Sequence, residues 1–117
     1  MEQNGGALRR RFAEIMKSYA IRISKQADID IENLHFYIFE ICKSPITSKR
    51  YIEGLFNKIK SLTRSAESYP ITSMKSVLQY GYNARRINYK KMAIIYTVHQ
   101  KAVLIHRVIS GALISEL

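Results

Sequence analysis

The side chains best suited to chemistry are cations in the last third of the chain. They lie close together in the sequence, at Arg85, Arg86, Lys90, Lys91 and Arg107. His106 stands directly before Arg107 and falls within a predicted strand. Cleavage of RNA through its 2′-hydroxyl needs a base, cations around the crowded phosphate and an acid for the leaving oxygen. Arg86, His106 and Arg107 are therefore candidates for such catalysis, and all five cations are candidates for binding a nucleic acid or another acidic target.

His106 also has a structural interpretation. In a strictly alternating strand it shares a face with Leu104 and Val108, opposite Arg107. On that geometry His106 is a histidine held within the sheet rather than a general base beside Arg107.

The neighbouring arginines have structural alternatives as well. Arg85 and Arg86 are adjacent on one predicted strand, so their side chains must point to opposite faces. One of them can form an ion pair with Glu53 or Glu67 while the other meets solvent. Three tyrosines lie among these cations and could stack on bases or simply pack the rim of a sheet; they are Tyr80, Tyr82 and Tyr89.

Charge is concentrated in one part of the chain. The 117 residues include 19 Lys and Arg against 9 Asp and Glu, a net charge of +10. Residues 43–117 carry 13 of those basic and 3 of those acidic side chains. Lys58, Lys60 and Arg64 are expected on the solvent face of a helix, where they can also contact a target. Such an excess predicts an acidic protein partner or a nucleic acid, because self-repulsion otherwise disfavours it.

Composition narrows the class of protein further. With 47% hydrophobic residues, the chain can bury the core of one small domain. Cys42 is the only cysteine, which excludes an internal disulfide and a cysteine-based zinc site and favours the cytoplasm. No apolar run approaches the roughly 20 residues that span a bilayer, and no cofactor or metal ion is expected. We expect residues 1–15 to be an N-terminal extension and residues 16–117 to be the domain.

Two amphipathic helices are predicted to position the candidate residues. The first begins after Ser24, its expected N-cap, and ends before the Ser44-Pro45 break. The second is expected to begin at Thr47 or Ser48 and to end before Tyr69-Pro70. In the first helix, the apolar stripe expected to be buried consists of Ala27, Ile31, Leu34, Ile38 and Ile41, and Phe36, Phe39 and Cys42 widen it. In the second, it consists of Ile52, Leu55, Ile59, Leu62 and Ala66. A connection this short predicts an antiparallel helical hairpin.

Alternating apolar residues predict four strands. The first, residues 19–23, is expected to turn Tyr19, Ile21 and Ile23 inward. After an irregular segment over residues 71–83, three strands follow at residues 84–89, 92–98 and 102–109, and the middle one is apolar on both faces and therefore central. The order strand, helix, helix, strand, strand, strand predicts an α+β fold: a small, mostly antiparallel sheet covered on one face by a long helical hairpin.

These residues resemble the RelE/ParE superfamily of bacterial type II toxins over about residues 16 to 114. The resemblance is carried by IRISKQA at residues 21–27, by a hairpin that ends at Tyr69-Pro70, and by ARRINYKKMAIIYTVHQKAVLIHRVISGAL at residues 84–113. The strand pattern and hairpin length are closer to the ParE branch than to the RelE branch.

The resemblance implies a toxin held inactive by an acidic, partly disordered antitoxin in a hetero-oligomer. ParE-like members inhibit DNA gyrase, whereas RelE-like members are endoribonucleases that cleave messenger RNA on the ribosome, so whether this chain is an enzyme stays open. Many ParE-like chains follow the last strand with His-Gly and a basic and an acidic residue, where this chain has Ser110 to Ile114. The absence of these groups argues against a nuclease more than against a gyrase inhibitor, because acid–base chemistry depends on specific side chains whereas a protein-binding toxin depends on surface shape. A basic nucleic-acid-binding module without toxic action is a third alternative.

Overall fold

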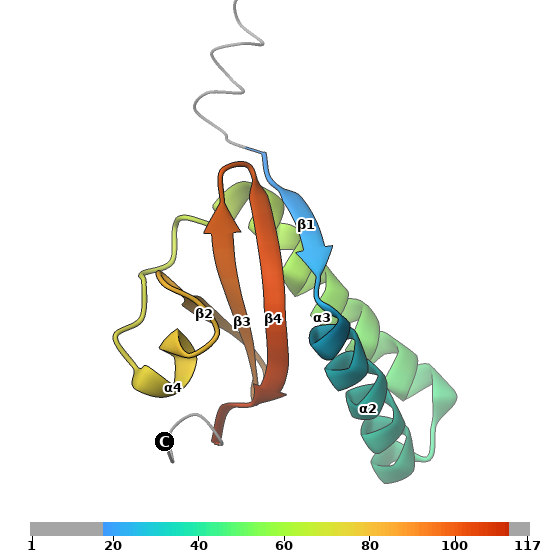
Figure 1. The fold of residues 1–117 in the computed structure, drawn as a ribbon. Helices are drawn as coiled ribbons and strands as arrows, with labels where there is room; N and C mark the ends of the chain where they lie inside the picture. Colours follow the sequence, from blue (N-terminus) through green and yellow to red (C-terminus); the bar gives the residue numbers. More distant parts are fainter. Residues whose placement is uncertain (1–17, 113–117) are drawn as a thin grey trace, which may run out of the picture.

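The computed structural model describes residues 18–112, which form one four-stranded sheet and three helices (Figure 1). Along the chain the elements are β1 (Ala20–Ile23), α2 (Lys25–Cys42), α3 (Pro45–Ser65), α4 (Lys75–Leu78), β2 (Arg85–Tyr89), β3 (Met92–His99) and β4 (Ala102–Ser110). The predicted N-terminal extension, residues 1–15, lies outside the described residues. Within the described residues, no helix is long and apolar enough to span a bilayer.

The sheet has the strand order β1-β4-β3-β2. β1 pairs with β4 in parallel, while β2 with β3 and β3 with β4 are antiparallel. The predicted α+β class, the mostly antiparallel sheet and the central position of β3 are therefore confirmed.

Serine caps begin both long helices. The Ser24 hydroxyl accepts a hydrogen bond from the Ala27 amide at 3.0 Å, as predicted, and the Ser44 hydroxyl accepts one from the Thr47 amide at 3.3 Å. The predicted start of α3 at Thr47 or Ser48 is wrong, because Pro45 occupies the first turn, where its missing N–H costs nothing. Lys43, in the left-handed conformation with φ 54°, ends α2 and allows the chain to reverse.

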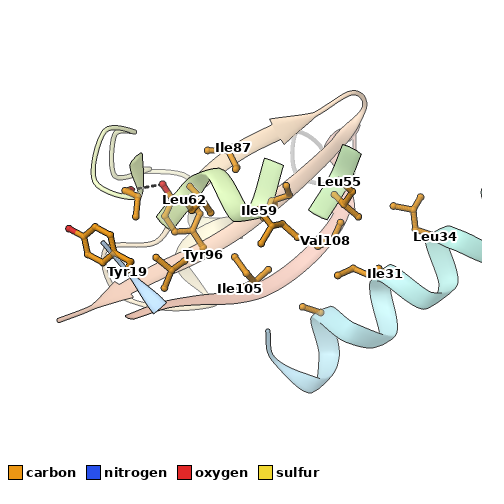
Figure 2. Close-up of a cluster of buried hydrophobic side chains, with 14 of the residues drawn as sticks. Tyr19, Ile31, Leu34, Leu55, Ile59, Leu62, Ile87, Tyr96, Ile105 and Val108 are labelled. Atoms are coloured by element: carbon orange, nitrogen blue, oxygen red, sulfur yellow. Dashed lines mark hydrogen bonds between the residues drawn. The ribbon is translucent and has the colours of Figure 1, made fainter. Parts of the chain in front are cut away.

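The main core lies between the hairpin and one face of the sheet (Figure 2). Every residue of the predicted α3 stripe is buried there. The prediction for α2 is confirmed at Ala27, Ile31 and Leu34, which are buried, and in part at Ile38, which packs against the core. It is wrong at Phe36, 69% exposed, and at Ile41, 59% exposed. Phe36 lies on the side of α2 opposite the buried stripe, and Figure 1 shows that the end of α2 at Cys42 reaches past the sheet, so no strand of the described sheet lies beneath it.

A second, smaller apolar cluster lies on the opposite face of the sheet. Val77 of α4 packs there with Ala84, Ala93 and Ile95. The prediction that residues 71–83 are irregular is therefore wrong for α4, a helix too short to produce a periodic signal.

The predicted burial of β1, which forms one edge of the sheet, is only partly confirmed. Tyr19 is buried as predicted, but Ile23 is 37% exposed because β1 ends there and the chain turns into α2.

Candidate functional site

A β-bulge in β4 decides where the candidate catalytic side chains point. Ile95 pairs with Arg107 and Tyr96 pairs with Ile105, which leaves His106 as an extra residue between the two pairs. Ile105 and Val108 both lie in the core beneath the hairpin. His106 and Arg107 therefore both project to the opposite face, and the prediction that they face opposite ways is wrong because strict alternation fails at a bulge.

Arg86 lies on the same face as this histidine and arginine. It pairs with Ile95, which in turn pairs with Arg107, so the backbones of the two arginines lie two strand spacings apart, about 10 Å. The Arg86 Nε atom donates a hydrogen bond to the Asn88 side-chain oxygen at 3.0 Å. The sheet thus brings together all three residues that the sequence suggests for RNA cleavage.

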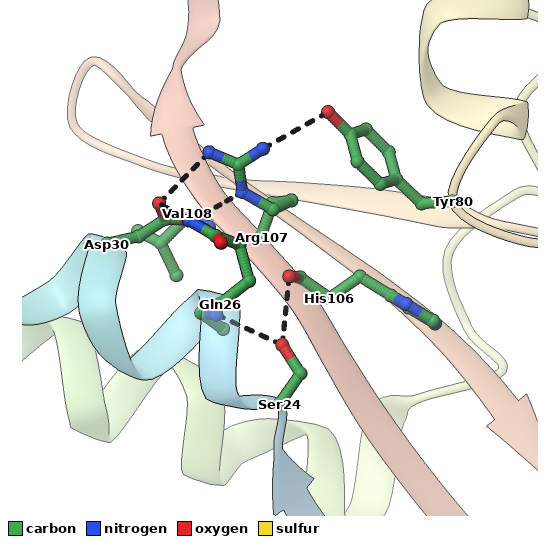
Figure 3. Close-up of polar contacts among 8 residues, drawn as sticks. Ser24, Gln26, Asp30, Tyr80, His106, Arg107 and Val108 are labelled. Carbon is green, nitrogen blue, oxygen red and sulfur yellow. Dashed lines mark hydrogen bonds and ion pairs between the residues drawn. The ribbon is translucent and has the colours of Figure 1, made fainter.

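Arg107 is held in an ion pair with Asp30 of α2 (Figure 3). Its Nε donates to Asp30 Oδ2 at 2.7 Å, and a second guanidinium nitrogen donates to Oδ1 at 3.0 Å. Asp30 Oδ2 also accepts the Val108 amide at 3.0 Å, and a further guanidinium nitrogen of Arg107 lies 3.4 Å from the Tyr80 hydroxyl. The Asp30 hydrogen bond raises the pKa of Arg107 above its ordinary value. The Arg107 guanidinium therefore links α2 to β4.

The sequence did not point to Asp30 as the partner of Arg107. The two residues are 77 positions apart, and an aspartate near the start of a helix is already accounted for by the helix dipole. They meet because β1 ends at Ile23, so that α2 begins beside the edge of β4 that β1 leaves open.

His106 is tied into a short chain of hydrogen bonds. Its Nε2 lies 2.7 Å from the hydroxyl of the buried Thr97, and the Nε2 of His99 lies 2.7 Å from the same oxygen. Since a hydroxyl has one proton and two lone pairs, at most one imidazole can accept from it and at least one must donate its Nε2–H. Burial, followed by the charge of His99, lowers the pKa of His106 below 6.5. His106 is therefore neutral near pH 7, with its Nε2 already occupied.

Arg85 lies on the hairpin side, away from these three residues. Its guanidinium donates to the main-chain carbonyls of Glu67 and Tyr69 at the end of α3. The prediction that one of the two arginines pairs with the carboxylate of Glu53 or Glu67 is wrong for Arg85, which contacts the Glu67 main-chain carbonyl. The Glu67 carboxylate accepts a hydrogen bond from the Tyr19 hydroxyl. Burial, together with that hydrogen bond, raises the pKa of Tyr19 to about 12. Arg85 thereby fixes the end of α3 to the sheet.

Lys90 and Lys91 form the turn between β2 and β3. Lys90 has φ 54°, and its ammonium lies 5.0 Å from the ring centre of Tyr51 and 5.7 Å from that of Tyr89. The Tyr89 hydroxyl donates to the Tyr51 carbonyl at 2.8 Å. The Lys91 carbonyl accepts the Gly111 amide at 2.9 Å, which brings the end of β4 to this turn, while the Lys91 side chain is exposed.

No group of three or more His, Cys, Asp or Glu side chains within residues 18–112 is placed to hold a metal ion. The candidate cations serve in an ion pair, in carbonyl contacts, against aromatic rings or in solvent. Such an arrangement suits recognition of an acidic surface better than proton transfer, which needs both an acid and a base positioned at the reacting group.

The fold is similar to that of a chain from the chromosomal ParDE TA system from P. aeruginosa, with a TM-score of 0.64 at 11% identity, covering 80% of this chain and 96% of that one. No curated protein is similar enough to this sequence to count as a match. Residues 21–113 match the family model described as the ParE toxin of type II toxin-antitoxin system, parDE. Because that match spans most of the chain, the protein belongs to the ParE toxin family of type II toxin-antitoxin systems.

Proposed function

We propose that this toxin inhibits DNA gyrase by binding it, without catalysing a reaction of its own. The Asp30–Arg107 ion pair is the observation that carries the proposal. It removes from use the arginine closest to His106, on the face where RNA cleavage would need a free cation. A toxin that acts by binding needs only a shaped and charged surface, which these interactions leave in place.

Cleavage of ribosome-bound messenger RNA is the alternative, and it has less support. It would need His106 to accept a proton from a 2′-hydroxyl through Nδ1, since its Nε2 is bonded to Thr97. Of the two arginines on this face, Arg86 would then be the one without a carboxylate partner among the described contacts. One arginine beside a histidine engaged elsewhere is an incomplete set for this chemistry.

An antitoxin is the partner that the family indicates, and we propose that it is acidic and acts in the cytoplasm. The net charge of +10 supports electrostatic attraction to a negatively charged chain. The exposed apolar side chains of α2 support a second, hydrophobic component of that contact; they are Phe36, Tyr37, Phe39 and Ile41.

The proposal is tested with one protein preparation in two assays. In the first, gyrase, ATP and relaxed plasmid are incubated with increasing amounts of the toxin, and a basic protein of similar size and charge controls for nonspecific DNA binding. In the second, ribosomes programmed with messenger RNA receive the same amounts. We expect loss of supercoiling beyond that of the basic control, with intact message. Cut message together with unaffected supercoiling would refute gyrase inhibition and support the nuclease alternative.

A further inference from the structure

The two helices of the hairpin carry opposite charge. α2 has four acidic residues and one lysine, whereas α3 has five basic residues and only Glu53 as an acid. The basic residues of α3 are Lys49, Arg50, Lys58, Lys60 and Arg64. An excess of +4 within one helix of 21 residues is a large share of the +10 on the whole chain. α3 thus carries a large share of the positive charge of the described fold.

Three of these cations share the side of α3 that points away from the sheet. With 3.6 residues per turn, Arg50, Lys60 and Arg64 fall within an arc of about 80°, opposite the buried stripe that includes Leu55 and Leu62. All three cations are exposed. At 1.5 Å per residue, the row from Arg50 to Arg64 is about 21 Å long.

This row is not neutralised within the part of the chain that the structure describes. Glu53, the one acid of α3, lies on the same side of the helix as the row, between Lys60 and Arg64, but its carboxylate is paired with the Lys49 ammonium at 4.0 Å. No ion pair among residues 18–112 involves Arg50, Lys60 or Arg64. The charge of the row therefore remains available to an external ligand.

The chemistry of this side of α3 fits phosphates better than a protein surface. Protein interfaces are depleted of lysine at their centre and are built around buried apolar and aromatic side chains. Three of the four exposed aromatic residues of the hairpin lie on α2: Phe36, Tyr37 and Phe39. On α3, exposed Ile46 lies in the first turn, before the row begins, and Phe56 lies on its flank. Phosphate binding needs cations and polar donors alone.

We propose that the solvent face of α3 binds the phosphate backbone of duplex DNA. The face consists of Arg50, Glu53, Asn57, Lys60, Ser61 and Arg64, with Glu53 paired to Lys49 at its edge. This inference rests on the proposed function and deepens it, because gyrase holds duplex DNA and a toxin bound to gyrase would contact the DNA as well as the enzyme. The contact itself needs no gyrase and is measured without it. Three phosphate contacts contribute about 2.7 to the slope of log affinity against log salt concentration.

The test compares two variants of equal net charge. Arg50→Gln/Lys60→Gln/Arg64→Gln removes three cations from the face, and glutamine has a helix propensity close to that of arginine and lysine. Lys25→Gln/Lys75→Gln/Lys101→Gln removes three exposed cations from other elements. Affinity for a 20-base-pair duplex is measured by fluorescence anisotropy between 50 and 200 mM salt, and circular dichroism confirms that both variants melt like the wild type.

We expect the α3 variant to lose at least about tenfold in affinity at 100 mM salt and its salt slope to fall by about 2.7, while the control variant loses less than about threefold. Equal losses in the two variants, or no binding of the duplex by the wild type, would overturn the proposal. So would a variant that binds the duplex normally but has lost affinity for a 20-residue polyglutamate peptide, because that would assign the face to an acidic protein. Gyrase inhibition by the α3 variant is scored separately, so failure of the proposed function is distinguishable from failure of DNA binding.

Discussion

Replacement of Asp30 by alanine tests the connection between the hairpin and the sheet. The substitution removes the acceptor of three hydrogen bonds, two from Arg107 at 2.7 and 3.0 Å and one from the Val108 amide at 3.0 Å. Removing one partner of a buried ion pair costs about 3 to 5 kcal/mol. The Asp30 side chain is 9% exposed and that of Arg107 26%, so we expect the lower end, about 3 kcal/mol. For a domain of this size that lowers the melting temperature by about 14 °C.

A double-mutant cycle separates the pair from its surroundings. The variants are Asp30→Ala, Arg107→Met and both together, each measured by urea unfolding at pH 7. Arg107→Met leaves the carboxylate with only the Val108 amide, whereas the double variant leaves neither charge unpaired. We expect the double variant to be at least about 1.5 kcal/mol more stable than the sum of the two single effects implies. Single effects that add to within about 0.5 kcal/mol would refute a direct pair.

Three further substitutions probe other parts of the fold. Gly54→Ala should lower the free energy of unfolding by about 1 to 2 kcal/mol, since the new Cβ would lie 2.3 Å from the Tyr89 hydroxyl. Adding Tyr89→Phe removes that hydroxyl and should relieve part of the cost. A destabilisation that Tyr89→Phe leaves unchanged would contradict the clash. Arg85→Met should cost about 2 kcal/mol in urea unfolding, because two carbonyls at the end of α3 lose a charged donor, and a neutral effect would show that those bonds contribute nothing. The lowered pKa of His106 means that the unfolded chain takes up a proton near pH 6.5 before the folded chain does, so stability should fall as pH drops below about 6.5. His106→Gln should reduce that dependence in melting curves at pH 7.5 and 5.5; an identical pH dependence would show that another group titrates.

The sequence predicted the elements more accurately than their connections. Apolar spacing located both long helices and all four strands, because burial against a sheet imposes a period that the residues must follow. It overextended the buried stripe of α2 to Ile41, since periodicity shows which side of a helix is apolar but not where the sheet beneath it ends.

The candidate site was only partly predictable. Clustering of cations identified Arg86, His106 and Arg107, which do share one face of the sheet. The bulge that brings His106 and Arg107 together leaves no mark on the alternation of side chains, and Asp30 is paired through the fold rather than through sequence spacing. Whether a side chain is free or committed depends on its partners, which the spacing of residues does not show.

The central claim, that this toxin acts by binding gyrase rather than by acid–base chemistry, is tested most directly by the gyrase inhibition of an Arg86→Gln/His106→Gln variant. We predict that the variant stays folded and inhibits supercoiling with a potency within about threefold of the wild type, since binding does not need a proton donor or acceptor at these positions. A wild type that cuts ribosome-bound messenger RNA, together with a folded variant that no longer does, would contradict the account.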